Sequence, residues 1–351
     1  MLERLRERIR DAAGRRAALR LRGGGSKDFY GGEPRGEILD TRVHAGIVEY
    51  EATELVVTAR CGTPLAELEA ALAEKGQMLP FEPPRFGADA TLGGCVAAGL
   101  SGPRRAAAGA VRDFVLGARL LDGRADELAF GGRVMKNVAG YDVARLLAGS
   151  LGTLGLILEV SLKVLPRPPA EATLRLELPQ DKALEALNRW AGQPLPVTAS
   201  AWRDGELHLR LSGAERAVRA AAQHLGGHTL APGDAGRFWE SIREHTHPFF
   251  AGAAPLWRLS LPAPAAPLAL AGAPLIEWGG ALRWLRTEAD AAAVRAAAAS
   301  AGGHATLFRG GDKSAGVFAP LAMGAKRLHR ELKAAFDPAG VFNPGRLYPD
   351  L

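Results

Sequence analysis

Cysteine is scarce in this sequence, with only Cys61 and Cys95 among 351 residues. Two thiols cannot form a disulfide framework or a four-thiolate metal site. Residues 1–16 form the densest basic stretch of the chain, but they also include several acidic residues and have no apolar core. They therefore do not resemble a targeting peptide. We therefore expect a cytoplasmic protein, in which residues 1–16 form an amphipathic docking helix.

Long apolar runs and the usual nucleotide-binding motifs are also missing. The longest uncharged run, residues 259–276, contains four prolines, which a membrane-spanning helix would not tolerate. There is no G-x-x-x-x-G-K-[ST] sequence, and GSLGTLG at 149–155 lacks the G-x-G-x-x-G spacing. The net charge is +6, but basic residues are interleaved with acids and no nucleic-acid recognition motif occurs. These absences argue against a membrane span, a P-loop enzyme, a Rossmann protein and a nucleic-acid-binding protein.

Glycine, by contrast, is abundant, with 43 residues that concentrate before residue 160. The stretch RGGGSK at 22–27 places three glycines between Arg22 and a Ser-Lys pair. Successive backbone N–H groups without side chains in the way suit a phosphate or a pyrophosphate. A tight turn between a strand and a helix explains the glycines about equally well, so both interpretations stay open at this point.

The periodicity of the first 165 residues predicts alternating strands and helices. Residues 54–60 and 154–164 have the pattern of strands, and residues 114–130 have that of a hairpin with an Asp-Gly turn. A helix is expected to have Pro64 at its first position and Thr63 as its cap.

The proline cluster at 166–169 marks the expected domain boundary. Beyond it, the order strand, helix, hairpin, helix and strand occurs twice, as in a ferredoxin-like plait. Two such halves would form one antiparallel sheet covered by helices. The predicted fold class is α+β, with a first domain at 1–168, a cap domain at 169–310 and a C-terminal segment at 311–351 that packs back on the first domain.

Several motifs, taken in chain order, resemble the PCMH-type FAD-binding domain of the vanillyl-alcohol-oxidase flavoproteins. They are RGGGS at 22–26, GTPLAEL at 62–68, TLGG at 91–94, SGP at 101–103, RDFVLGARLLDG at 112–123, KNVAGYD at 136–142 and GSLGTLG at 149–155. The resemblance covers nearly all of the first 165 residues. It implies two α+β subdomains with an extended FAD molecule between them.

The same resemblance implies three groups of cofactor-binding residues. Those expected at the pyrophosphate are Arg22, Gly23, Gly24, Gly25, Ser26, Lys27, Thr91, Gly93 and Gly94. Those expected along the ADP half are Gly152, Gly155 and Ile157. Those expected near the cofactor or in its loops are Ser101, Gly102, Lys136, Asn137, Tyr141 and Asp142, with a buried structural pair as the alternative for the last two.

The resemblance also bears on how the cofactor is held. Members with covalent flavin often carry histidine or cysteine in or near these loops, whereas Ser26 follows the glycines here. Cys95, which follows TLGG, is interpreted as a small buried thiol. We therefore expect FAD that is bound non-covalently.

Further motifs extend the resemblance nearly end to end, to the FAD-binding E subunits of bacterial glycolate oxidase. They are MLPFEPPRFG, TLGGCVAAGLSGPRR, FWESIRE, PLWRLSLP, IEWGGALRW and FDPAGVFNPGRLYP. The resemblance implies a glycolate dehydrogenase complex with a D-type flavin subunit and an F-type iron–sulfur subunit that passes electrons to membrane quinone. Association with the inner face of the membrane would come through those partners.

Catalytic residues are not assigned by this resemblance. The related D subunits hold a divalent metal in a histidine cluster, whereas His245 and His247 form the only close histidine pair here, so no metal site is expected. A 2-hydroxy acid needs a carboxylate anchor, for which Arg258 and Arg283 beside tryptophans are weak candidates. The alternative is cation–π packing or a subunit interface. Asn343 in NPGR either hydrogen-bonds the flavin ring or forms a structural turn.

Three functions follow from these observations. The favoured one is an FAD subunit of the glycolate-oxidising complex, with turnover centred on the D-type subunit. The others are an independent FAD-dependent dehydrogenase of a small 2-hydroxy acid such as D-lactate, and a non-catalytic assembly subunit. The intact glycine loops disfavour the last, and the missing histidine cluster disfavours the second.

Overall fold

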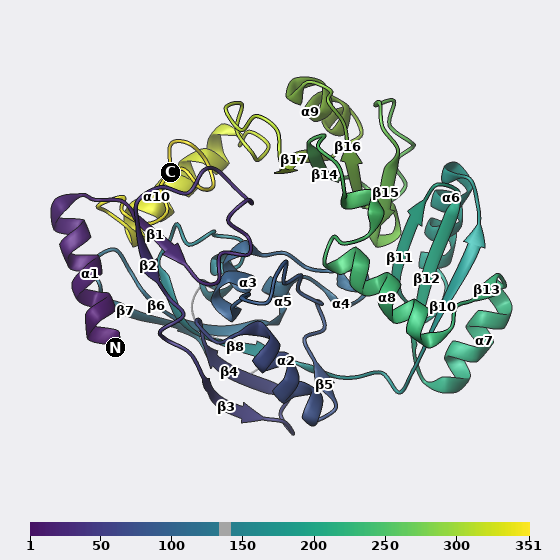
Figure 1. Ribbon diagram of the computed structural model, residues 1–351, viewed down its shortest axis with the longest axis horizontal. Helices are drawn as coiled ribbons and strands as arrows, with labels where there is room; N and C mark the ends of the chain where they lie inside the picture. The colour runs from purple at the N-terminus through teal and green to yellow at the C-terminus, as the bar shows by residue number, and fades with distance from the viewer. Residues whose placement is uncertain (133–141) are drawn as a thin grey trace.

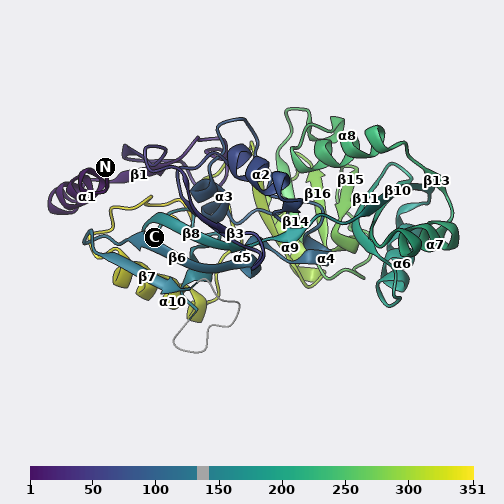
Figure 2. The ribbon, with the colours of Figure 1, turned by 90° about the horizontal axis from the view of Figure 1, so that it is seen from below.

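The computed structural model describes residues 1–132 and 142–351. Two sheets dominate it, one of five strands in the order β3-β4-β8-β6-β7 and one of eight in the order β13-β10-β12-β11-β15-β16-β14-β17. The two sheets lie side by side along the longest axis of the molecule (Figures 1 and 2). Among the described residues, every helix is too short or too polar to cross a lipid bilayer.

The first region of the chain contains the five-stranded sheet. Its elements are α1 (Leu2–Arg15), β1 (Leu19–Arg22), β2 (Glu37–Asp40), β3 (Ile47–Glu51), β4 (Val56–Arg60), α2 (Leu65–Glu74), β5 (Gln77–Met78), α3 (Leu92–Ala98), α4 (Arg105–Ala108), α5 (Val111–Phe114), β6 (Val115–Leu121), β7 (Glu127–Gly131), η1 (Ala144–Leu147), β8 (Leu156–Lys163) and β9 (Leu165–Pro166). The predicted helices, strands and hairpin are present. The predicted cap is wrong, because Pro64 is the N-cap of α2 and the Thr63 hydroxyl instead bonds the backbone of Gly46.

Strand β8 forms the centre of this sheet, antiparallel to β4 and β6. Its alternate residues Leu156, Leu158 and Leu162 are at most 1% exposed, as the period of two predicts. Ile157 on the opposite face is also buried, because α3 packs against the strand. The strand is therefore buried on both faces, and one of them faces the site described below.

The second region contains the eight-stranded sheet, in which every pairing is antiparallel. Its elements are β10 (Ala170–Glu177), α6 (Gln180–Ala191), β11 (Val197–Arg203), β12 (Glu206–Gly213), α7 (Glu215–Leu225), β13 (His228–Thr229), α8 (Pro232–Arg243), η2 (Pro248–Phe250), β14 (Leu256–Ser260), β15 (Pro274–Glu277), η3 (Trp278–Gly280), β16 (Leu282–Arg286), α9 (Ala291–Ser300) and β17 (His304–Arg309). The strand orders of the two halves mirror each other and join where β11 pairs with β15. The single sheet is as predicted, but residues 261–273 form a loop where the second half would have its first helix, and α8 was not predicted.

The chain then returns to the first region through α10 (Met323–Phe336), which lies beside β7 (Figure 2), with the ring centres of Phe336 and Phe130 6.0 Å apart. The Leu19 N–H donates to the Val341 carbonyl at 2.7 Å, and the Asn343 N–H donates to the Leu19 carbonyl at 2.9 Å. We keep the division into residues 1–168, 169–310 and 311–351 as a proposal, which the change of sheet between β9 and β10 supports.

The two regions meet through an apolar cluster and a buried ion network. Tyr30 and Leu151 of the first region share the cluster with Trp284 and Phe308 of the second. Next to it, the Glu82 carboxylate accepts hydrogen bonds from the Arg104 N–H at 2.9 Å and from Arg210 Nη2 at 2.9 Å. Burial alone would raise the pKa of Glu82, but the charges and hydrogen bonds of Arg210 and Arg104 lower it below the usual value.

We expect the Glu82→Gln substitution to destabilise the protein by about 3 kcal/mol at neutral pH, because the buried Arg210 loses its carboxylate partner and Arg104 keeps only Glu171. A carboxyl whose pKa is lowered on folding stabilises the folded state above its unfolded pKa, here 4.5, and the contribution is lost as the pH falls through the lowered folded pKa. Denaturant unfolding at several pH values measures the free energy of unfolding of the wild type and the variant, and hence the pH dependence of the difference. The surface substitution Glu185→Gln is the control, and equal effects of the two would contradict a special role of Glu82.

Candidate cofactor site

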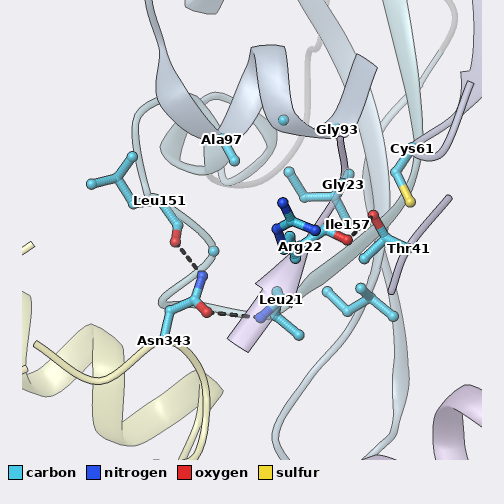
Figure 3. Close-up of a pocket in the computed structure, with 14 residues that line it drawn as sticks. Leu21, Arg22, Gly23, Thr41, Cys61, Gly93, Ala97, Leu151, Ile157 and Asn343 are labelled. Atoms are coloured by element: carbon cyan, nitrogen blue, oxygen red, sulfur yellow. Dashed lines mark hydrogen bonds between the residues drawn. The ribbon is translucent and has the colours of Figure 1, made fainter. Parts of the chain in front are cut away.

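A hollow in the first region lies where β1, α3 and the loop after η1 meet (Figure 3). It consists of two adjoining cavities of about 390 and 590 Å³. Both are lined by Leu21, Arg22, Gly23, Gly94, Ala97, Leu151 and Asn343. We call this hollow the glycine cleft.

The loop that follows β1 forms one wall of the glycine cleft. Residues 23–27 all line it, and Gly25 has a left-handed φ of 76° that favours glycine. Within the described chain, no backbone N–H of residues 23–27 donates a hydrogen bond to a protein group. A run of free N–H donors beside an open cleft is suited to the oxygens of a diphosphate.

The start of α3 forms the floor of the cleft, but its donors are already used. The Leu92 N–H donates to the Thr63 carbonyl at 2.9 Å, and the Gly93 N–H donates to the Cys61 carbonyl at 2.8 Å. The Gly94 N–H donates to the Thr91 hydroxyl at 3.2 Å. Gly93 and Gly94 therefore border the cleft without offering free N–H groups, which differs from the phosphate-holding role expected of them, and the Thr91 hydroxyl is taken up by the Gly94 N–H.

Close packing within the protein explains some of the glycines. A Cβ at Gly24 would overlap the Asp89 carbonyl oxygen, and one at Gly23 would overlap the Thr91 hydroxyl. Gly94 differs, because a Cβ there would have only the Thr91 hydroxyl nearby, at 3.2 Å. Of these three positions, Gly94 is the one at which an added methyl group would fill the cleft and leave the fold intact.

The two basic side chains of the loop have different partners. Arg22 Nε donates to the Asp28 carboxylate at 3.0 Å, and Arg22 also lines both cavities of the cleft (Figure 3). Lys27 Nζ donates to the Arg85 carbonyl at 3.1 Å and lies 5.6 Å from the centre of the Phe86 ring. Burial lowers the pKa of Lys27. The free backbone donors and Arg22 thus form the anion-binding surface of the loop.

The opposite wall comes from the loop before β8. Gly152, Gly155 and Ile157 line it where the sequence placed them. The Asn343 amide spans the two walls, accepting from the Leu21 N–H at 2.8 Å and donating to the Leu151 carbonyl at 2.6 Å (Figure 3). Both ends of this side chain are therefore engaged by backbone, which supports the structural alternative over a bond to the flavin ring.

Other residues expected near the cofactor lie away from the cleft. The Ser101 hydroxyl accepts from the backbone of α5, and the Gly102 carbonyl accepts from the Trp278 indole of the second region. Asp142 is exposed and pairs with Arg145 at 3.0 Å. Lys136, Asn137 and Tyr141 fall outside the described residues.

Arg283 does not have the free guanidinium that a carboxylate anchor needs. Its side chain is 2% exposed and donates to the carbonyls of Gly280, Ala265 and Ala266. It holds the 261–273 loop in place, which argues against the substrate-binding role considered for it.

Arg258 lies instead on the face of the eight-stranded sheet that meets the first region. Its guanidinium is 5.3 Å from the centre of the Trp278 ring, and that of Arg105 is 4.4 Å from the same ring. In the described parts of the chain, neither arginine forms an ion pair with a carboxylate. The packing alternative is thus present in the structure, and the nearest carboxyl groups act on the two arginines through charge alone, Glu277 on Arg258 and Asp113 on Arg105.

The two close histidines lie in different surroundings. His245 stacks on Phe250 with ring centres 3.8 Å apart, and burial lowers its pKa well below the usual value. His247 accepts from the Phe249 N–H and caps η2. No group of three or more His, Cys, Asp or Glu side chains that could hold a metal ion occurs among the residues described.

Several residues of interest had no sequence signal. Leu21, Thr41, Cys61, Ala97 and Leu151 line the cleft because loops distant in sequence meet there. Glu277 accepts from the Trp284 indole at 2.7 Å, and burial raises its pKa to about 7. A carboxyl that titrates near neutral pH is suited to proton transfer.

The glycine cleft fits FAD. It combines free backbone donors for a diphosphate, small residues that allow close approach, and apolar side chains such as Leu21 and Ile157 for the flat rings. Cys61 borders the cleft, but burial raises the pKa of its thiol to about 12, so it stays neutral and a poor nucleophile. This supports the expectation of non-covalent FAD.

We expect the Gly94→Ala substitution to weaken FAD binding about tenfold or more, because the methyl group occupies the cleft. The apoprotein should be as stable or slightly more stable, since alanine favours the helix. FAD titration and thermal unfolding measure the two effects. Gly14→Ala at an exposed position of α1 is the matched control, and wild-type affinity in the Gly94 variant would rule out this cleft.

Comparison with known proteins gives a consistent result. The family described as "FAD binding domain" matches residues 2–130. The chain is 50% identical over 347 residues to "Glycolate oxidase subunit GlcE" of Escherichia coli strain K12, spanning 99% of this chain and 97% of that protein. It is 34% identical over 128 residues to "Glycolate oxidase subunit GlcD" of Bacillus subtilis strain 168, spanning 36% of this chain and 27% of that one.

A solved structure of alkyldihydroxyacetonephosphate synthase superposes with a TM-score of 0.67 at 16% identity, over 97% of this chain and 74% of that one, and shows the shared fold alone. The identity with GlcE, in contrast, spans both the cleft and the cap. The chain therefore belongs to the family of the glycolate oxidase subunit GlcE and has an FAD-binding domain.

Proposed function

We propose that this protein is the FAD-binding subunit of a glycolate oxidase complex, which oxidises glycolate to glyoxylate. The observation that carries the proposal is 50% identity over 97% of the GlcE chain. The proposed partners are a D-type flavin subunit and an F-type iron–sulfur subunit that passes electrons to quinone. These partners would also supply the contact with the inner face of the membrane.

Turnover is proposed to centre on the D-type subunit. The match to GlcD spans 128 residues, 36% of this chain and 27% of GlcD, so most of GlcD has no counterpart in the match. When bound, the flavin supplies an acceptor for the hydride of a hydroxy acid. The proposed role of this chain is to hold the diphosphate with the N–H groups of residues 23–27, in a cleft lined by the first region and the C-terminal segment.

One observation favours a second candidate, in which this chain itself oxidises a small 2-hydroxy acid. Arg105 and Arg258 both lie over Trp278 at the contact between the two regions, and neither has a carboxylate partner within the described residues. A guanidinium pair beside an indole is a suitable binding place for a small carboxylate.

The visible spectrum of the purified chain, before and after anaerobic glycolate, tests the main proposal. We expect a bound-flavin spectrum that glycolate does not bleach in this chain alone, and bleaching when the D-type subunit is coexpressed. Bleaching in the chain alone would favour the second candidate. Absence of flavin from both preparations would favour a non-catalytic assembly subunit.

The Arg258→Met substitution separates the roles of the arginines. We expect the complex to co-purify and to keep its turnover within twofold, with a loss of about 1 kcal/mol in stability from the broken cation–π contact. Arg189→Met, which removes an exposed guanidinium near Trp190, is the control. Lost turnover in an intact complex would make Arg258 a substrate anchor, and lost co-purification would make it an interface residue.

A further inference from the structure

Backbone hydrogen bonds attach the segment after α10 to the edge of the glycine cleft. Phe342 lies parallel to Leu19 in an isolated bridge, and the flanking hydrogen bonds from Leu19 and Asn343 attach the segment beside β1. Asn343 itself has a left-handed φ of 41° and is 5% exposed. Asparagine is one of the few residues that adopt this conformation readily.

A buried lysine makes a second attachment between the same segment and the opposite wall. Lys333 Nζ donates to the Thr153 carbonyl at 2.8 Å and to the Phe342 carbonyl at 2.7 Å. Its charge is balanced by Asp337 at 2.7 Å. The Asp337 carboxylate also accepts from the Phe342 N–H at 2.7 Å, so the turn that leads to Asn343 is held from both sides.

The two walls of the cleft are thereby connected through one side chain. Leu21 immediately precedes the free donors of residues 23–27, and Leu151 belongs to the loop that contains Gly152. A Cβ at Gly152 would lie 2.6 Å from Asn343 Nδ2, so glycine at this position lets the amide approach the loop. Without the amide, no other described side chain would hydrogen-bond both Leu21 and Leu151.

We propose that Asn343 is a positioning residue that sets the separation of the two walls, so that FAD affinity depends on the C-terminal segment. The inference rests on the proposed FAD site and goes beyond the FAD-binding domain match, which ends at residue 130. In this proposal Asn343 acts through its hydrogen bonds to Leu21 and Leu151 rather than through a bond to the cofactor.

The test uses the full chain without cofactor and two substitutions. Asn343→Ala removes both hydrogen bonds and is expected to weaken FAD binding by at least about tenfold. Asn343→Asp keeps the size, the left-handed conformation and the acceptor for Leu21, but it cannot donate to Leu151. We expect it to weaken FAD binding while the apoprotein unfolds within a few degrees of the wild type.

The readouts are the dissociation constant of FAD by fluorescence titration and the rise in Tm that FAD causes. Asn188→Ala is the matched control, since its amide donates to the Leu184 and Ala263 carbonyls far from the cleft. A purely structural role predicts that all three variants lower the apoprotein Tm and keep the FAD-induced rise.

Two results would overturn the inference. One is a dissociation constant of FAD for Asn343→Asp within twofold of the wild-type value. The other is a loss of FAD affinity in Asn188→Ala as large as that in Asn343→Ala. A wild-type chain that binds no FAD would instead refute the proposed site, so the two failures are distinguishable.

Discussion

The buried carboxylate of Glu82 fixes how the two sheets face each other. A charge in a poorly solvated contact needs partners, and those of Glu82 come from both regions, as Arg104 and Arg210. Rotating the second region away would separate the buried Arg210 from Glu82, which would keep Arg104 alone. The same orientation places Glu244, at the end of α8, beside the backbone of residues 85 and 86. Its carboxylate accepts hydrogen bonds from the N–H groups of Arg85 at 3.0 Å and Phe86 at 2.9 Å. Because Lys27 bonds the Arg85 carbonyl, the ion network reaches the wall of the glycine cleft.

Local patterns predicted most elements of the fold. The hairpin at 114–130, the helix that buries Leu65, Leu68 and Leu72, and the alternation along β8 each depend on neighbours in sequence, so their periods and turn residues sufficed. The loop in place of a helix at 261–273 was not predictable in this way. It is held by Arg283, whose partners are backbone carbonyls that no side-chain pattern reveals.

The candidate site was predictable in location but not in its hydrogen bonds. Glycine motifs indicated which loops form the cleft, yet the donors of α3 are taken by the carbonyls of Thr63 and Cys61, which only the folded chain brings there. Asn343 was marked by its motif, and its two partners lie 322 and 192 residues away. Glu277 had no signal, because its raised pKa comes from burial in the assembled sheet.

The likeness to GlcE and the likeness to GlcD divide the molecule in different ways. The first spans cleft and cap together, whereas the second spans about a third of the chain. About two thirds of this chain therefore lies outside the match to GlcD. Fold alone does not determine chemistry, so a shared fold is not evidence of a shared substrate.

The pairing of Leu19 with Phe342 has a consequence for biosynthesis. Chains grow from the N-terminus, and contacts between distant residues form late. The glycine loop is translated well before Asn343, whose amide joins its strand to the opposite wall. Until Asn343 has emerged from the ribosome, the two walls of the nascent cleft lack the hydrogen bonds that connect them.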